Sequence, residues 1–175
     1  MSSETKIDPA SLTIQKVRRT RAHIFAAFTH AKEESTLKCR ENPLASFTAA
    51  LDALAPAVCI ICGFPASYAE KMTVGGITLA GPLDGQMITI IAKKDLPDNS
   101  RPLNIATPLR LIFAPEQAGE ATPGEKAVPL PKNLVALIET VVAETKKYVA
   151  GERAQGMINF EAGAEEEGEA EGGEA

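Results

Sequence analysis

The chain has 175 residues, of which 45% are hydrophobic and only 5% aromatic, and its formal net charge is −5. These values are normal for a globular chain of one domain, with a core built from Ala, Leu, Ile and Val. Three cysteines, an odd number in a chain without a secretory signal pattern, argue against a disulfide framework. The apolar stretch 54–64 contains Pro56 and is too short for a predicted membrane span.

The negative charge is concentrated at the C-terminus. Residues 161–175 contain seven glutamates and no lysine or arginine, so residues 1–160 sum to +2. Proteins that handle nucleic acid use such a tail to compete with phosphates for a basic face, although many other soluble proteins carry one too. We predict a disordered N-terminus at 1–10, a single domain at 11–154 and a flexible acidic tail at 155–175.

Three strands are predicted at the start of the domain. Leu12, Ile14 and Val17 lie in a β-prone stretch, and residues 23–28 continue with alternating apolar positions. A third short strand is predicted at 35–40. We expect these strands to be antiparallel.

A helix is predicted after the third strand. Asn42 is a good N-cap and Pro43 fits the first helical position. Pro56 removes a backbone donor, so residues 58–62 form either a kinked continuation or a new short helix that ends at Gly63. The buried face of the first helix is predicted from apolar residues spaced by three and four, which are Leu44, Phe47, Leu51 and Leu54.

The second half begins with a predicted hairpin. Its strands span 73–80 and 86–93, and Gly75-Gly76 is read as a bulge in the first of them. Residues 87–92 are apolar on both faces apart from Thr89, which predicts a strand that is covered on both sides.

The rest of the domain is predicted to contain an edge strand, a loop and a helix. The strand at 103–113 is interrupted by Pro108, residues 114–131 form a long loop, and the helix at 132–150 is ended by Gly151. The resulting order is β-β-β-α-β-β-β-α. This order predicts an α+β fold, in which two helices pack on an antiparallel sheet.

A basic cluster near the first strand is the main candidate binding site. Residues 1–40 contain eight Lys or Arg against four Asp or Glu. We predict that this strand edge contacts phosphates, while the alternative is a solvated edge that is kept basic to prevent edge pairing. Phe25 is the candidate platform for base stacking, because Ile24 and Phe28 share the predicted core face. The predicted cations are Lys16, Arg18, Arg19, Arg21, Lys38 and Arg40, with Lys93 and Lys94 as an extension from the second half.

Signals for catalysis, metal binding or a cofactor are nearly absent. Cys59 and Cys62 have the CxxC spacing of redox and zinc sites, but they lie in the most apolar segment of the chain. We therefore interpret them as structural thiols. The sequence has none of the phosphate-loop, zinc-protease, serine-hydrolase or dinucleotide motifs, so we expect no enzyme and no cofactor.

A short apolar motif follows the last predicted helix. Gln155, Ile158 and Phe160 resemble the linear motifs through which replication proteins dock on sliding clamps. This resemblance implies a replication protein as a partner. The alternative is that the motif folds back onto its own domain.

Part of the chain resembles a family of small uncharacterised bacteriophage and prophage proteins. The resemblance rests on Ala-Leu-Asp-Ala-Leu-Ala-Pro at 50–56, Tyr-Ala-Glu at 68–70, Thr-Val-Gly-Gly-Ile at 73–77 and Gly-Glu-Arg-Ala-Gln-Gly at 151–156. It implies a role in replication or recombination. The acidic extension departs from the short, aromatic-ended tail of such proteins.

The leading hypothesis is a cytoplasmic, non-enzymatic accessory protein of DNA metabolism, in the host cytoplasm if a phage encodes it. It would bind single-stranded DNA through the basic strand edge, and its tail would regulate binding or recruit a partner. The alternative is an adaptor that docks on a replication protein through residues 155–160 and binds no nucleic acid. An exposed sheet edge would also permit a homo-oligomer.

Overall fold

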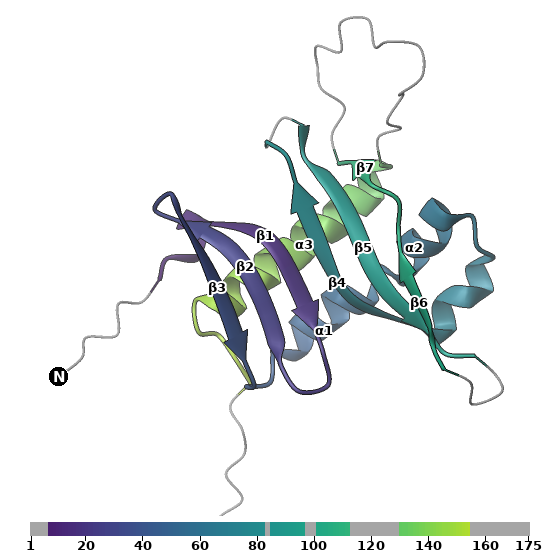
Figure 1. The fold of residues 1–175 in the computed structure, drawn as a ribbon, viewed down its shortest axis with the longest axis horizontal. Helices are drawn as coiled ribbons and strands as arrows, with labels where there is room; N and C mark the ends of the chain where they lie inside the picture. Colours follow the sequence, from purple (N-terminus) through teal and green to yellow (C-terminus); the bar gives the residue numbers. More distant parts are fainter. Residues whose placement is uncertain (1–6, 83–84, 97–100, 113–129, 155–175) are drawn as a thin grey trace, which may run out of the picture.

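An antiparallel sheet with helices on one face forms the body of the protein (Figure 1). The computed structural model describes residues 7–82, 85–96, 101–112 and 130–154. The predicted α+β class is confirmed. The acidic tail and nearly all of the predicted 114–131 loop lie outside the described residues. Within the predicted N-terminal segment, Pro9–Ser11 forms a 3-10 turn capped by Asp8.

The sheet has the strand order β3-β2-β1-β4-β5-β6, and the two-residue strand β7 pairs with β5. The first strands of the two halves, β1 and β4, therefore pair at the centre of the sheet, and the later strands of each half follow in sequence order towards the two edges. All pairings are antiparallel. The strands are β1 (Leu12–Arg19), β2 (Ile24–His30), β3 (Glu33–Cys39), β4 (Met72–Ala80), β5 (Met87–Lys94), β6 (Leu103–Ala106) and β7 (Arg110–Leu111).

A bulge in β1 decides which of its side chains face the helices. The register against β2 shifts between Ile14 and Lys16, so Gln15 is the extra residue. Ile14 and Val17 are therefore both buried on the helix side although three positions separate them. Lys16 and Arg18 consequently point to the face that carries no helix. The predicted bulge at Gly75-Gly76 in β4 is confirmed by a second register shift.

The first helical segment is divided into two helices, α1 (Ala45–Asp52) and α2 (Ala55–Cys62). Pro56 lies in the first turn of α2, and Gly63 ends α2 with a φ of 69°. The new short helix of the two alternatives is therefore confirmed.

The predicted N-cap of α1 is wrong, because the helix begins at Ala45 and its cap position is Leu44. The carbonyl oxygen of Asn42 instead accepts a hydrogen bond from the amide of Ala154 at 3.0 Å. The Tyr148 hydroxyl donates to the carbonyl oxygen of Glu41 at 2.7 Å. These long-range contacts hold residues 41–42 against the C-terminal end of the domain.

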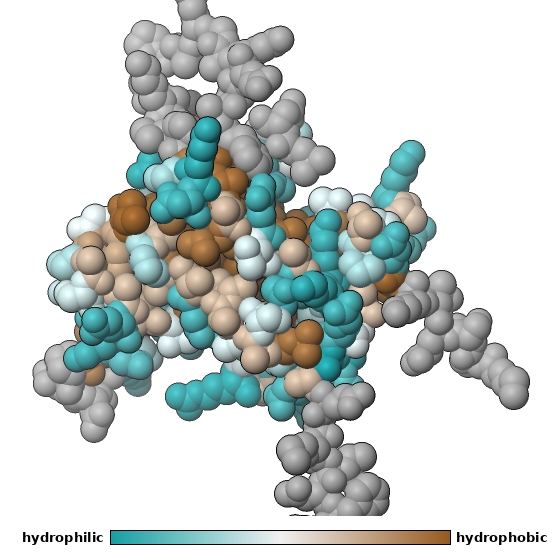
Figure 2. All heavy atoms as spheres, turned by 180° about the vertical axis from the view of Figure 1, so that it is seen from behind, coloured by the Kyte–Doolittle hydropathy of each residue, from teal (hydrophilic) through white to brown (hydrophobic). Residues whose placement is uncertain are grey.

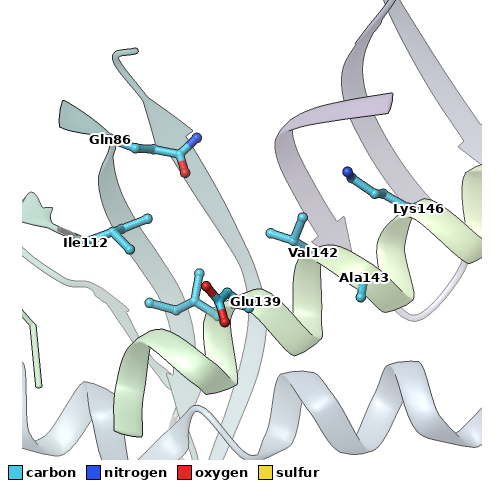
Figure 3. A pocket seen from close by; sticks show the side chains of 7 residues that line it. Gln86, Ile112, Glu139, Val142, Ala143 and Lys146 are labelled. Atoms are coloured by element: carbon cyan, nitrogen blue, oxygen red, sulfur yellow. The ribbon is translucent and has the colours of Figure 1, made fainter. Parts of the chain in front are cut away.

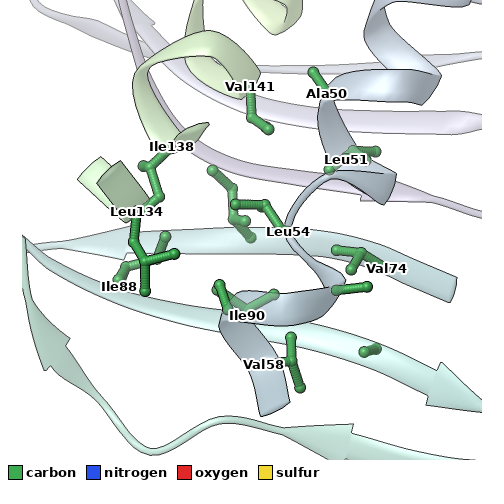
Figure 4. Close-up of a cluster of buried hydrophobic side chains, with 14 of the residues drawn as sticks. Ala50, Leu51, Leu54, Val58, Val74, Ile88, Ile90, Leu134, Ile138 and Val141 are labelled. Atoms are coloured by element: carbon green, nitrogen blue, oxygen red, sulfur yellow. The ribbon is translucent and has the colours of Figure 1, made fainter. Parts of the chain in front are cut away.

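The stretch Ala45–Cys62 also meets the length and composition of a membrane span, but α1 and α2 divide it and 44% of it is buried inside the structure. Leu51, Leu54 and Val58 are fully buried. These side chains pack against the sheet and against the last helix, α3 (Lys132–Val149). Figure 4 shows Leu134, Ile138 and Val141 of α3 close to these residues and to strand side chains of β4 and β5. Most of the core is aliphatic, as the composition predicts, but its two largest fully buried side chains, Phe47 and Tyr148, are aromatic and lie with ring centres 5.7 Å apart.

Helix α3 crosses behind the sheet from β7 towards the first three strands (Figure 1). It begins at Lys132 as predicted and ends at Val149, one residue before the predicted end, and Gly151 follows at a φ of 101°. Near its C-terminal end, Val149 packs in a second cluster of buried residues with Leu12, Ile14, Ala26 and Phe28. Helix α3 therefore packs against strands from both halves of the sheet.

A polar link joins α1 to α3 within this apolar contact. Glu144 is only 7% exposed, and it accepts hydrogen bonds from Ser46 at 2.5 Å and from Lys147 at 2.6 Å. The bond from Lys147 and then that from Ser46 hold the pKa of Glu144 below its usual range. A carboxylate with a lowered pKa stabilises the fold above its unfolded pKa, and this contribution is lost as the pH falls through the folded pKa.

We expect Glu144→Gln to lower the free energy of unfolding at neutral pH by about 1–2 kcal/mol, because two charge-assisted hydrogen bonds lose their ionised acceptor. The deficit should shrink below the unfolded glutamate pKa of about 4.3. Urea unfolding at pH 7 and at pH 3 measures both effects. Glu139→Gln, an exposed change on the same helix, is the control, and an equal deficit in both variants at pH 7 would contradict the assigned link.

The opposite face of the sheet is not covered by any described helix (Figure 1). Along β5, Ile88, Ile90 and Ala92 are buried on the helix side, whereas Met87 and Ile91 are only half-buried on the other. The prediction that β5 is covered on both sides is therefore wrong. We call this surface the open face.

Candidate nucleic-acid interface

A basic hollow of about 390 Å³ lies on the open face of the first three strands. Lys16 and Arg18 reach it from β1, Phe25 from β2 and Lys38 from β3. The prediction that the cations of β1 lie at a strand edge is wrong, because β1 pairs with β2 on one side and with β4 on the other. The sheet brings these residues together on a face, and edge protection cannot explain the charges of Lys16 and Arg18, whereas Lys38 lies on the edge strand β3. The basic hollow is lined by Lys16, Arg18, Thr20, His23, Phe25 and Lys38.

Strand register places the single aromatic side chain of the hollow between two cations. Phe25 pairs with Arg18 of β1 on one side and with Lys38 of β3 on the other. Paired residues in antiparallel strands project to the same face, about 5 Å apart. The Lys16 ammonium lies 5.9 Å from the centre of the Phe25 ring. Three positive groups therefore surround one partly exposed aromatic ring.

A tight turn between β1 and β2 closes one end of the hollow. The hydroxyl oxygen of Thr20 accepts hydrogen bonds from the amides of Ala22 and His23, at 3.3 and 3.1 Å. The same oxygen lies 3.2 Å from Nδ1 of His23. This geometry fixes Thr20 and His23 beside the cations, where they add hydrogen-bonding groups. Arg21 lies in the same turn and is exposed.

Arg19 does not share the open face. Its guanidinium lies 2.6 Å from the Asp52 carboxylate of α1 and donates to the carbonyl oxygen of Val74 at 3.0 Å. The side chain therefore connects β1, α1 and β4 on the helix side. The prediction that Arg19 belongs with Lys16 and Arg18 is corrected by the alternation of side chains along β1.

Lys93 and Lys94, which were predicted to extend the basic cluster from the second half of the chain, lie on opposite faces of the sheet. Lys93 is exposed on the open face, two strands away from β1. Lys94 is 8% exposed on the helix side, and its ammonium lies 3.9 Å from the centre of the Tyr68 ring. Lys94 is therefore not part of the basic hollow. Arg40 is exposed just after β3 and does not line the hollow.

Acidic residues are scarce on the open face. Among the strand residues that the structure describes, alternation and pairing place only Glu34 there, on the outermost strand. Across the centre of the sheet the row that begins with Lys38, Phe25 and Arg18 continues through Gly76 and Ile91. A ligand that leaves the hollow along this row would meet a glycine and an aliphatic side chain, without an opposing charge.

A second hollow, of about 290 Å³, lies on the helix side. Figure 3 shows Gln86 and Ile112 on the strand side of it and Glu139, Val142 and Lys146 on α3. Figure 2 shows this side of the molecule, with apolar and polar side chains interspersed. The described lining combines aliphatic groups with one carboxylate and one ammonium, and it has no aromatic ring. It therefore lacks the features that distinguish the basic hollow.

The three cysteines are free thiols. Cys59 is buried in α2, and burial is the main cause that raises the pKa of Cys62. A raised pKa disfavours the reactive thiolate. In the described part of the chain, no group of three or more His, Cys, Asp or Glu residues could hold a metal ion. The geometry gives these thiols no ligand set.

No family model, curated protein or solved structure matches the chain. The resemblance to phage proteins therefore stays a prediction, and the function is argued from the site alone. Thr20 and His23 line the basic hollow but are absent from the predicted set of site residues. The signal for His23 was its place at the start of an alternating strand, next to the basic cluster. The motif of Gln155, Ile158 and Phe160 lies outside the described residues.

Proposed function

We propose that the protein is a single-stranded DNA-binding accessory protein of DNA metabolism. The observation that carries this proposal is the position of Phe25, which lies between Arg18 and Lys38 in strand register and beneath the Lys16 ammonium. Phosphates of a strand would contact the cations, and a base would stack on the ring. A helix-free sheet face with an aromatic platform is a common way to bind single strands.

The chemistry of the hollow favours a single strand over a duplex. A duplex hides the faces of its bases, whereas a single strand offers a base for stacking beside each phosphate. The basic hollow also lies on a sheet, and the structure describes no helix there that could enter a major groove. We expect weak sequence preference, because stacking and phosphate contacts do not read base edges.

The acidic tail has the composition of an internal competitor. It follows Ala154, whose amide bonds to Asn42, so the tail begins near the chain segment that follows β3. A tethered segment competes at a high effective concentration. Seven glutamates in residues 161–175 would occupy the basic hollow when no DNA is present.

We expect the chain truncated after residue 160 to bind a labelled oligothymidine more tightly than the full chain does. The difference should be about tenfold at low salt and should narrow as salt screens the tail. Fluorescence anisotropy of both forms, titrated at low and moderate salt, measures it. A variant with the tail glutamates changed to glutamine controls for tail length and should match the truncation.

The absence of binding by either form at micromolar protein would overturn the proposal. It would favour the adaptor hypothesis, in which residues 155–160 dock on a replication protein. Equal, salt-independent affinities would also contradict it, because phosphate contacts release counterions. Stronger binding to a duplex than to oligothymidine would exclude the stacking role of Phe25.

A further inference from the structure

The two edges of the sheet differ in how they are protected. At one edge, β6 has four residues and is separated from β7 by a segment containing Pro108. Short strands and proline are usual devices that prevent edge pairing. At the other edge, β3 pairs with β2 over seven residues without a register shift, and it contains no proline. β3 is therefore a regular edge strand, and no residue in the described part of the chain pairs with its outer side.

The hairpin geometry identifies which backbone groups of β3 point away from β2. Ala31 and Lys32 both have positive φ, at 49° and 70°, and form a two-residue turn between His30 and Glu33. In such hairpins the residues that flank the turn form a hydrogen-bonded pair, and bonded and non-bonded pairs then alternate. The amides and carbonyls that point away from β2 therefore belong to Glu34, Thr36 and Lys38.

These three residues form a self-complementary set. If two copies of β3 pair antiparallel about Thr36, Thr36 lies opposite its own copy, and Glu34 lies opposite Lys38. All three outward backbone pairs then satisfy one another, and the two charged pairs have opposite signs on the same face. The same register thus allows the backbone hydrogen bonds between the two strands and places each Glu34 opposite a Lys38.

We propose that the β3 edge is a homodimer interface, in which two copies of the chain pair about Thr36. The partner is a second copy, and the sheet continues through the interface. An antiparallel pair keeps the same face of both sheets on one side, because opposite residues project together. The dimer therefore presents two basic hollows on one continuous open face. This interface exists without DNA and does not depend on the proposed function.

The test is a charge swap, measured by sedimentation velocity of the full chain without DNA over a range of concentrations. We expect a concentration-dependent dimer for the unaltered chain. E34K and K38E each place like charges opposite each other at two positions and should raise the dimer Kd about tenfold or more. The double variant E34K/K38E restores opposite charges and should recover the dimer. E33K makes the same charge change on the other face of β3, as a matched control.

A monomer at high-micromolar concentration for the unaltered chain would overturn the proposal. So would a dimer that survives both single variants, or a double variant that stays as weak as the singles. Circular dichroism should show unchanged secondary structure in all variants, since Glu34 and Lys38 are exposed. Because the readout is mass without nucleic acid, failure of the dimer leaves the DNA-binding proposal to its own test.

Discussion

Replacing Lys16, Arg18 and Lys38 together by glutamine is expected to weaken oligothymidine binding by about 10- to 100-fold at moderate salt. These are the three cations that line the basic hollow. Each one lost removes a phosphate contact and the counterion release that accompanies it. The slope of log K against log salt should become shallower by about 2, because single strands contribute about 0.7 per contact. Anisotropy titrations at several salt concentrations provide both values.

A second triple variant controls for the loss of net positive charge by itself. Replacing Lys71, Lys132 and Lys146 by glutamine removes the same number of positive charges from η2 (Ala66–Lys71) and α3. We expect less than a threefold change in affinity for this variant, from the weaker long-range attraction alone. If both triples weaken binding equally, the protein attracts DNA through its net charge and the basic hollow is not its binding site.

The element order was predictable because strong local signals agree with the tertiary fold. Alternation marked β2, the spacing of Phe47, Leu51 and Leu54 marked the buried face of the first helical segment, and Gly63 ended α2 at the expected position. Pro56 predicted either a kinked continuation or a new short helix, and the structure has the new short helix, α2. Agreement between local preference and global packing is what makes such predictions succeed.

The faces and edges were less predictable, because they depend on pairings between distant residues. The β1 bulge between Ile14 and Lys16 turns Lys16 and Arg18 to the open face, and regular alternation beyond it places Arg19 on the helix side. Only the pairing of β1 with β4, across about sixty residues of sequence, places Lys16 and Arg18 on an interior strand of the sheet and not at its edge. Likewise, α1 begins at Ala45, and the carbonyl oxygen of Asn42, the predicted cap, accepts a hydrogen bond from the amide of the distant Ala154.

Replacing Gly76 by alanine is expected to lower the free energy of unfolding by about 3 kcal/mol or more. A Cβ at this position would lie 2.0 Å from the carbonyl oxygen of Val17 and 3.0 Å from Cα of Arg18. Gly76 also has a φ of +153°, which L side chains rarely adopt. Both strands are central, so neither backbone can move aside without disturbing its other neighbour. Thermal unfolding should show a midpoint about 10 °C lower.

Gly75→Ala is the matched control, because its Cβ would meet only ordinary contacts, at 3.6 Å from the carbonyl oxygen of Ile91. We expect it to change stability by less than about 1 kcal/mol. Equal losses at both positions would contradict the assigned close approach of β1 and β4. The same approach fixes Arg18, which pairs with Gly76. A partly folded Gly76→Ala variant should therefore also lose oligothymidine affinity, whereas Gly75→Ala should keep it.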